Sequence, residues 1–256
     1  MKICLDYGHG GKDSGCVGGA ILEKDIVKLI GKQVKDSLIR NNVEVIETRK
    51  ADEYVSLSDR CIISNNNNCD LFVSIHANSV ENSSVKGFEI YHAPASNNGT
   101  RLSKLIHDEI VTSNLLNNNR GIKENTYTVL TGTVAPAVLI ELGFLNNLDD
   151  RSLLINKQNN FAIAITKGIL KYFNKDFINF NNSNVNNKIY RVQCGAFKTY
   201  NNAIKLSKEL KSKGYDYIII KDGNLHKVQV GAYKLKTNAD RIKEKLNNQG
   251  YNCFIV

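Results

Sequence analysis

The last quarter of the chain repeats itself, and two copies of one pattern leave few folds open. Residues 191–220 align without gaps on residues 227–256, at an offset of 36 residues from Arg191 to Lys227. In each copy, alternating apolar residues precede an apolar stripe at helical spacing, and a short apolar run follows, which predicts strand, helix, strand. Two copies in tandem predict a βαββαβ order, a small ferredoxin-like α+β domain made of two repeats.

The excess positive charge of the chain lies in the same region. The whole chain has 34 basic and 25 acidic residues, a formal net charge of +9. From residue 187 onward there are 14 basic and 5 acidic residues, which leaves 20 of each in the rest of the chain. A basic module joined to a neutral one predicts attraction to a polyanion: nucleic acid, an anionic cell-wall polymer or a membrane surface.

Strand and helix patterns alternate through the first 173 residues. Residues 71–75 and 137–140 are continuously apolar, as in parallel strands that helices cover on both faces. This predicts an α/β fold, a three-layer αβα domain with a mostly parallel sheet. The predicted strands are residues 2–6, 43–48, 70–76, 87–92, 127–130 and 137–141, and the predicted helices are residues 23–40, 57–67, 100–115, 150–156 and 159–173.

An asparagine-rich segment without clear periodicity separates the two parts. Its composition predicts a linker. Three apolar side chains in it, Phe177, Ile178 and Phe180, are candidates to dock on a neighbouring domain. We therefore expect a domain over residues 1–173, a linker over 174–187 and a second domain over 188–256.

The sequence shows no export or membrane signal. No apolar run approaches the ~20 residues needed to span a membrane, and the start has neither the n-region nor the h-region of a secretory signal. The six cysteines are scattered without CxxC spacing, so we expect free thiols. These features predict a soluble protein, made in the cytoplasm without a signal peptide and not inserted in a membrane.

Three of the predicted strands lead into a residue that can bind a metal or transfer a proton. His9 follows the first strand, and His76 and Glu141 end the two continuously apolar ones. Glu23 follows a glycine-rich loop just before the first helix. Because ligands of open α/β sheets bind at the C-terminal ends of the strands, we expect these side chains to share one edge of the sheet.

This set of side chains is typical of metal-dependent hydrolysis. Two histidines, a carboxylate and a water are the usual ligands of a hydrolytic zinc site. Such a site keeps the metal a strong Lewis acid, which lowers the pKa of its water to roughly 7. Hydrolysis also needs a general base beside that water, and Glu141 suits this role because an apolar surrounding raises the pKa of a carboxyl group.

Each candidate taken alone also has an ordinary structural explanation. His9 could be a turn residue, and Glu23 could be a carboxylate that answers the helix dipole. Arg60 could pair with a carboxylate near the site or remain a charge on a helix surface. Cys16 lies between two candidates, but a thiolate as fourth ligand would block the open coordination position.

Several motifs of the first 173 residues occur together and in order: GHGGKDSG, the Glu23 that follows it, SLSDRCIISNNNNCDLFVSIHAN, KGFEIYH and PAVLIELGFLNN. Together they resemble the zinc-dependent N-acetylmuramoyl-L-alanine amidases. The resemblance implies that His9, Glu23 and His76 bind Zn²⁺ and that Glu141 is the catalytic carboxylate. It also implies cleavage of the amide between the lactyl group of muramic acid and the L-alanine of the stem peptide. Tyr7 departs from the family, which usually has proline at this position.

The basic repeat resembles the SPOR-type peptidoglycan-binding domains, which share the βαββαβ architecture. Mother-cell-lysis amidases of spore formers and clostridial phage endolysins pair the two modules and likewise lack signal peptides. The resemblance implies binding to peptidoglycan and anionic cell-wall polymers rather than nucleic acid, and action on the wall after membrane permeabilisation or lysis. None of these features predicts the oligomeric state.

Strand alternation divides the side chains of the repeat between two faces. Val192 and Cys194 share one face with their counterparts in the second copy. We expect four polar residues to face outward and to contact glycan, although a merely solvated face is the alternative. They are Arg191, Gln193, Lys227 and Gln229.

The expected mechanism is hydrolysis by zinc-activated water. Zinc polarises the scissile carbonyl, and Glu141 takes the proton of the water and passes it to the leaving amine. A second hypothesis is a non-catalytic wall-binding or regulatory protein with a vestigial amidase domain, against which the complete ligand set argues. A third is an RNA-binding protein, since basic βαββαβ modules often bind RNA, but only Phe197 and Tyr233 supply aromatic rings near the strands.

Overall fold

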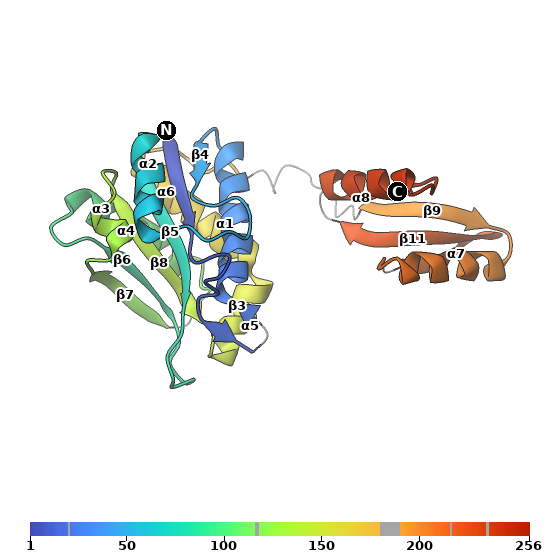
Figure 1. Ribbon diagram of the computed structural model, residues 1–256, viewed down its shortest axis with the longest axis horizontal. Coiled ribbons are helices and arrows are strands. Elements are labelled where there is room, and N and C mark those ends of the chain that lie inside the picture. Colours follow the sequence, from blue (N-terminus) through green and yellow to red (C-terminus); the bar gives the residue numbers. More distant parts are fainter. Residues whose placement is uncertain (20, 116–117, 180–189, 216, 234–235) are drawn as a thin grey trace. The chain divides into compact units, whose positions relative to one another are not determined.

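The computed structural model describes residues 1–256 except 20, 116–117, 180–189, 216 and 234–235. The chain forms two compact units, Met1–Ile178 and Asn179–Val256, and each is described by itself (Figure 1). Among the described residues, no helix combines the length and the apolar character that crossing a membrane requires.

The first unit is built on a six-stranded sheet in the order β4-β1-β5-β8-β6-β7. All neighbouring strands are parallel except β6 and β8, which run antiparallel. A two-stranded hairpin, β2 with β3, follows the first strand. The bounds are β1 Lys2–Tyr7, β2 Val17–Gly18, β3 Ile21–Leu22, β4 Glu44–Glu47, β5 Leu71–Asn78, β6 Phe88–His92, β7 Asn119–Glu124 and β8 Ala137–Phe144.

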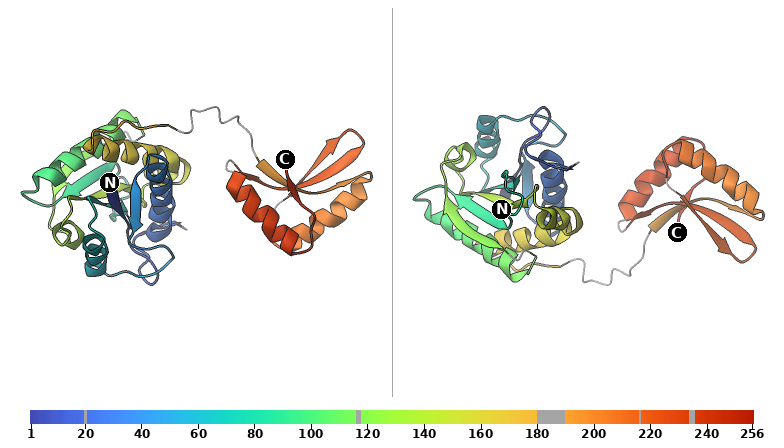
Figure 2. Two further views of the ribbon diagram at one scale, coloured as in Figure 1. Left: turned by 90° about the horizontal axis from the view of Figure 1, so that it is seen from above. Right: turned by 90° about the horizontal axis from the view of Figure 1, so that it is seen from below.

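Helices cover both faces of this sheet, which confirms the predicted αβα layering (Figures 1 and 2). On one face, α1, α3 and α6 bury alternate strand residues such as Leu5, Val73 and Ile140 in a large apolar core. On the other face, α2 and α4 pack over a smaller cluster that contains Cys4 and Phe72. The helix bounds are α1 Glu23–Arg40, α2 Leu57–Asn66, α3 Asn97–Thr112, α4 Thr128–Thr131, α5 Leu148–Asn156 and α6 Gln158–Tyr172.

One predicted strand is wrong. Residues 127–130 were expected to extend, but α4 is a short helix over Thr128–Thr131. Val129 and Leu130 are buried against the smaller cluster, so tertiary packing overrides their preference for strands. The strand of this region is β7, an edge strand of sequence NRGIKE that pairs with β6. Its one large apolar residue produces no strand pattern in the sequence.

The first unit extends beyond the predicted boundary at residue 173. Phe177 packs against the large core, and the backbone N–H of Ile178 donates a 2.8 Å hydrogen bond to Oδ1 of Asn41. These two docking candidates therefore belong to the first unit. Phe180 and most of the predicted linker lie outside the described residues.

The second unit has the predicted βαββαβ order. Its antiparallel sheet runs β10-β11-β9-β12, and both helices pack on β9 and β11 (Figure 2). Between helices and sheet lies a core that includes Val192, Val230, Leu210 and Leu246. The bounds are β9 Tyr190–Phe197, α7 Tyr200–Ser212, β10 Tyr217–Asp222, β11 Leu225–Tyr233, α8 Lys236–Asn248 and β12 Phe254–Ile255.

The expectation that the two glutamines of the repeat are exposed is wrong. Gln193 and Gln229 lie opposite each other in the register of β9 and β11, and only 4% and 7% of their surfaces are exposed. A 3.4 Å hydrogen bond from Nε2 of Gln229 to Oε1 of Gln193 joins them. Each glutamine side chain therefore helps to cover the other, because the two are cross-strand neighbours. Arg191 and Lys227 are half-buried.

Candidate metal and hydrolytic site

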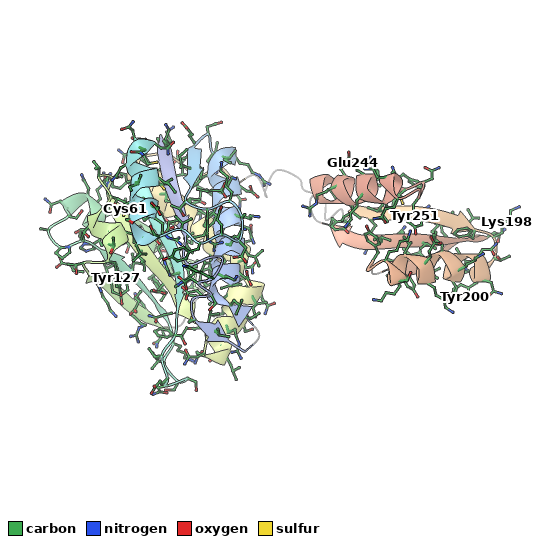
Figure 3. All side chains as sticks on the ribbon, viewed as in Figure 1. Cys61, Tyr127, Lys198, Tyr200, Glu244 and Tyr251 are labelled. Carbon is green, nitrogen blue, oxygen red and sulfur yellow. The ribbon has the colours of Figure 1, made fainter. Side chains whose placement is uncertain are left out.

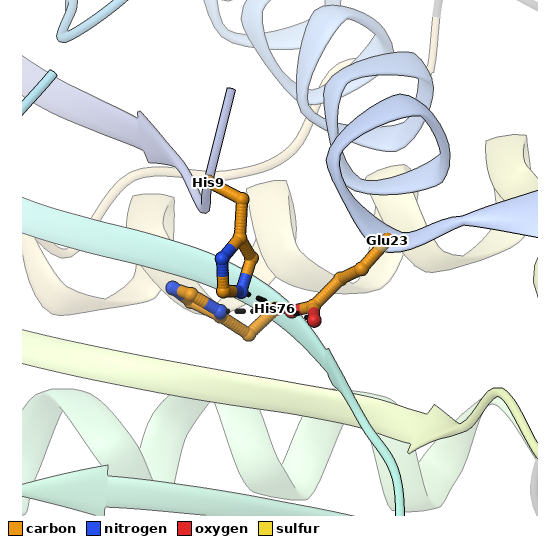
Figure 4. Close-up of side chains that lie close together, drawn as sticks. All are labelled: His9, Glu23 and His76. Atoms are coloured by element: carbon orange, nitrogen blue, oxygen red, sulfur yellow. Dashed lines mark hydrogen bonds and ion pairs between the residues drawn. The ribbon is translucent and has the colours of Figure 1, made fainter. Parts of the chain in front are cut away.

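The sheet order brings the candidate residues together. β1, β5 and β8 are adjacent and parallel, so their C-terminal ends meet at one edge. His9 lies just after β1, while His76 in β5 and Glu141 in β8 are direct register partners. Glu23 is the first residue of α1. Figure 4 shows three side chains converging: His9 from the loop after β1, Glu23 from α1 and His76 from β5.

Glycines allow this close approach. A Cβ atom on Gly8 would lie 2.3 Å from Cε1 of His76, and one on Gly15 would lie 2.6 Å from both Oε2 of Glu23 and Cδ2 of His9. Gly15 has a φ of +63°, and His9 itself has a φ of 60°. A non-glycine residue in this left-handed region is strained, so the surrounding loop must hold His9 in place.

The three side chains offer ligand atoms that all lie within 4.8 Å of one another. Nε2 of His9 is 3.1 Å from Oε2 of Glu23, and Nδ1 of His76 is 2.9 Å from Oε1 of the same carboxylate (Figure 4). The two rings meet edge to face with centroids 4.9 Å apart. This group could hold a metal ion.

Mutual hydrogen bonding controls the charges of the three groups. Burial opposes ionisation of Glu23, but hydrogen bonds to both histidines hold its pKa below the usual range. Burial also opposes protonation of His76, yet the hydrogen bond to Glu23 and the charge of Glu141 raise its pKa to about 9. The carboxylate of Glu23 thus stays ionised, and each imidazole contacts one of its two oxygens.

A second set of polar groups orients the three side chains. Oδ2 of Asp13 lies 2.9 Å from Nδ1 of His9, which directs Nε2 of that ring toward Glu23. The backbone N–H groups of Cys16 and Ala77 donate to the two oxygens of Glu23, at 3.0 and 3.1 Å. Such partners fix the tautomer and the orientation of metal-binding side chains.

Two buried arginines hold the backbone that leads to His9. Arg60 donates to the carbonyl oxygens of Tyr7 and His9, both at 2.8 Å. Arg49 donates to the carbonyls of Tyr7 and Gly8, at 2.8 and 3.0 Å. These bonds satisfy the carbonyls of three consecutive residues, from the last residue of β1 into the loop that follows, and they fix the path of the chain there.

Arg60 is also paired with a buried carboxylate, one of the two roles that the sequence left open. Its Nη1 lies 2.6 Å from Oδ1 of Asp6. The hydroxyl of Thr48 donates to the same oxygen and that of Ser74 donates to Oδ2, each at 2.6 Å. Burial would raise the pKa of Asp6, but the charge of Arg60 and the two hydroxyl groups hold it below the usual range. Sequence reasoning did not find Arg49 or Asp6, although an aspartate inside an apolar strand was an available signal.

Glu141 lines the same cleft as His9, Glu23 and His76. Within the part of the chain that the structure describes, its buried Oε2 has no hydrogen-bond partner. Burial raises the pKa of this carboxyl group to about 7. A carboxyl group that titrates near neutrality and keeps an unused oxygen is suited to accept and release a proton.

A cleft of 630 Å³ opens over these groups. His9, Glu23, His76 and Glu141 all line it. Tyr127, which is labelled in Figure 3, precedes α4 and also lines the cleft. The volume is typical of sites that bind small molecules or short polymer segments.

Glu89 is a further charged neighbour that sequence reasoning missed. It is the register partner of Glu141 on β6 and is buried, with Arg120 at 2.8 Å and Lys123 as ion-pair partners. A glutamate within the apolar run of GFEIY was the available signal.

Cys16 lines the cleft, but its thiol donates to the carbonyl of Ala77 at 3.1 Å.

Comparisons with known proteins find a family match for each of the two parts of the chain. Residues 3–171 match the family model described as N-acetylmuramoyl-L-alanine amidase, and residues 186–256 match that of the SPOR domain. A sporulation-specific N-acetylmuramoyl-L-alanine amidase of Bacillus subtilis is 33% identical over 223 residues, 86% of this chain and 84% of its own length.

Solved structures resemble the first unit. The amidase AmiC2 of Nostoc punctiforme is 38% identical with a TM-score of 0.65, over 68% of this chain and 98% of its own. The catalytic domain of the amidase CwlV from Bacillus (Paenibacillus) polymyxa is 32% identical with a TM-score of 0.65, over 68% and 99%. The chain therefore belongs to the N-acetylmuramoyl-L-alanine amidase family and carries a C-terminal SPOR domain.

Proposed function

We propose that this protein is a peptidoglycan hydrolase that cleaves the amide between the lactyl group of N-acetylmuramic acid and the L-alanine of the stem peptide. The observation that carries the proposal is the convergence of His9, Glu23 and His76 in one cleft, beside the buried and unpaired oxygen of Glu141. Membership of the amidase family supplies the bond that is cut.

We propose that His9, Glu23 and His76 hold a zinc ion. Two imidazoles and a carboxylate are the donor set of many catalytic zinc sites, in which the remaining position stays open for water or substrate. Each of the three residues offers one ligand atom, and these atoms lie within 4.8 Å of one another, so one ion could be held between them. When bound, zinc supplies Lewis acidity to water and to the scissile carbonyl.

In this mechanism Glu141 moves the proton. Oε2 of Glu141 accepts a proton from the attacking water and delivers it to the nitrogen of the leaving L-alanine. A pKa near 7 allows both transfers at neutral pH. The low dielectric of the buried position strengthens the electrostatic interactions of this carboxylate with the reacting groups.

The unusual Tyr7 is compatible with this role. Its side chain is fully buried, and its hydroxyl lies 3.1 Å from Oε1 of Glu47. A Cβ on Gly31 would lie 2.2 Å from the Tyr7 ring, so the ring fills the space that this glycine leaves in α1. Packing against α1 stiffens the approach to His9 here, where a proline would do so through its fixed φ.

We propose that the second unit anchors the enzyme to the wall. The SPOR match supports peptidoglycan as its partner, and the excess of basic residues supports anionic wall polymers as a further one. We propose a division into a catalytic domain, a linker and a wall-binding domain, and the two compact units, Met1–Ile178 and Asn179–Val256, support the two domains.

Digestion of purified peptidoglycan tests the proposal. We expect new alanine amino termini without new reducing ends, and no new amino termini when a chelator removes the metal. Glu141→Gln should keep its zinc and lose turnover, whereas Glu81→Gln, an exposed carboxyl outside the cleft, should behave as wild type. New reducing ends would reassign the bond, and an active Glu141→Gln enzyme would remove Glu141 from the mechanism.

A further inference from the structure

Two cysteines face each other at the edge of the sheet in the second unit. β12 is an edge strand that pairs with β9, with Phe254 opposite Gln193 and Ile255 opposite Val192. The same antiparallel register places Cys253 opposite Cys194. Both side chains are buried, at 5% and 7% exposure, in the core between sheet and helices.

The hydrogen-bond pattern of this ladder suits a covalent link at that pair. Arg191 and Val256 exchange both backbone hydrogen bonds, at 3.0 and 2.9 Å, so the alternation of an antiparallel ladder makes Cys194 and Cys253 a non-hydrogen-bonded pair. The N–H of Cys253 instead donates to Oδ1 of Asn247 at 2.8 Å. Such pairs have Cα atoms about 4.5 Å apart, within the range that a disulfide spans.

The thiols themselves are in contact, with Sγ atoms 2.6 Å apart. We propose that Cys194 and Cys253 form an oxidisable pair that closes to a disulfide and locks β12 onto β9. The two thiols lose two protons and two electrons as the S–S bond forms, and a small organic disulfide takes up the electrons and protons as it is reduced to two thiols. The pair is a modification site of the wall-binding unit and is independent of the hydrolytic site.

Reactivity is compatible with this assignment. The hydrogen bond to Cys194 lowers the pKa of the Cys253 thiol, which favours the thiolate that attacks a disulfide. In the first unit, burial raises the pKa of Cys4, Cys16 and Cys61, which keeps those thiols protonated and slow to react.

The link would stabilise a strand that few bonds otherwise hold. β12 contains two residues and lies at the edge of its sheet. By strand alternation, Phe254 points to the face opposite the core, where it is 51% exposed beside Gln193. A disulfide one residue away would fix the position of this exposed ring.

Thiol counting on the full-length protein tests the proposal. We expect six free thiols after reduction and four after exposure of the native protein to oxidised glutathione, with a linked peptide that contains Cys194 and Cys253. Cys194→Ser should give no linked peptide and lose at most one of its five thiols, to a mixed disulfide between Cys253 and glutathione. The matched variant Cys69→Ser should lose two of five, and it excludes a bond between Cys69 and its neighbour Cys4.

A second measurement follows the consequence for stability. Oxidation should raise the melting temperature of the wild-type second unit on the order of 10 °C and leave Cys194→Ser unchanged. Six thiols that persist in the folded wild type, or a linked peptide that joins other cysteines, would overturn the proposal. Because the wild type carries the primary readout, a variant that fails to fold does not affect the conclusion.

Discussion

Replacing Arg60 by methionine should destabilise the first unit severely, because Arg60 serves several buried acceptors at once. Arg60 is 3% exposed and Asp6 is fully buried. The guanidinium donates to Asp6 at 2.6 Å, to Tyr7 and His9 at 2.8 Å, and to Val55 at 3.0 Å. Methionine fills a similar volume but donates no hydrogen bond, so the substitution isolates the polar interactions.

The loss of folding free energy can be worked out from the groups that Arg60→Met leaves without a partner. Removing one partner of a buried ion pair costs about 3–5 kcal/mol, because the remaining charge stays desolvated. The carbonyls of Val55 and His9 lose their arginine donor, at about 1 kcal/mol each, while Tyr7 keeps its bond from Arg49. Thr48 and Ser74 still bond Asp6 and offset part of the loss. We expect a net cost of about 4 kcal/mol, a large part of the stability of an ordinary domain.

Urea unfolding of the full chain measures this cost. Far-ultraviolet circular dichroism is the suitable signal, because the chain has no tryptophan. Arg101→Met is the matched control: this exposed arginine donates to one carbonyl, that of Tyr172, and its loss should cost under about 1 kcal/mol. In a double-mutant cycle, Arg60→Met with Asp6→Asn should cost less than the two single changes added together. Strict additivity, or a loss below about 1.5 kcal/mol for Arg60→Met, would refute the reasoning.

Two further predictions concern the site directly. Gly15→Ala should weaken zinc binding roughly tenfold or more in a chelator competition, because its Cβ meets Glu23 and His9, while Gly121→Ala, also at positive φ but with nothing within 4 Å, should keep wild-type affinity; equal affinities would contradict the steric argument. In the metal-free protein, burial raises the pKa of Glu141 from 4.5 to about 7, so the folded state holds a proton that the unfolded state releases between these values. Stability should therefore fall as pH rises through this window, by up to about 3 kcal/mol more than in Glu141→Gln, and parallel pH profiles of unfolding would argue against a raised pKa.

Local patterns in the sequence predicted most of the elements because they depend on periodicity alone. The helix over residues 23–40 has the bounds that were predicted, and the strands that lead to His9, His76 and Glu141 lie within three residues of their expected ends. The pattern failed at β7 and α4. There the strand is a polar edge strand, and the apolar residues are buried by a short helix instead.

The sequence by itself determined the elements, the repeat of the second unit and the candidate residues, because spacing and residue type are local properties of the chain. Only the tertiary structure decided which strands are neighbours, and it therefore placed Glu23 between two histidines and Asp6 against Arg60. It also decided burial, which depends on what packs across a sheet. For that reason Gln193 and Gln229 cover each other instead of facing solvent, and Cys194 meets Cys253 across 59 residues of chain.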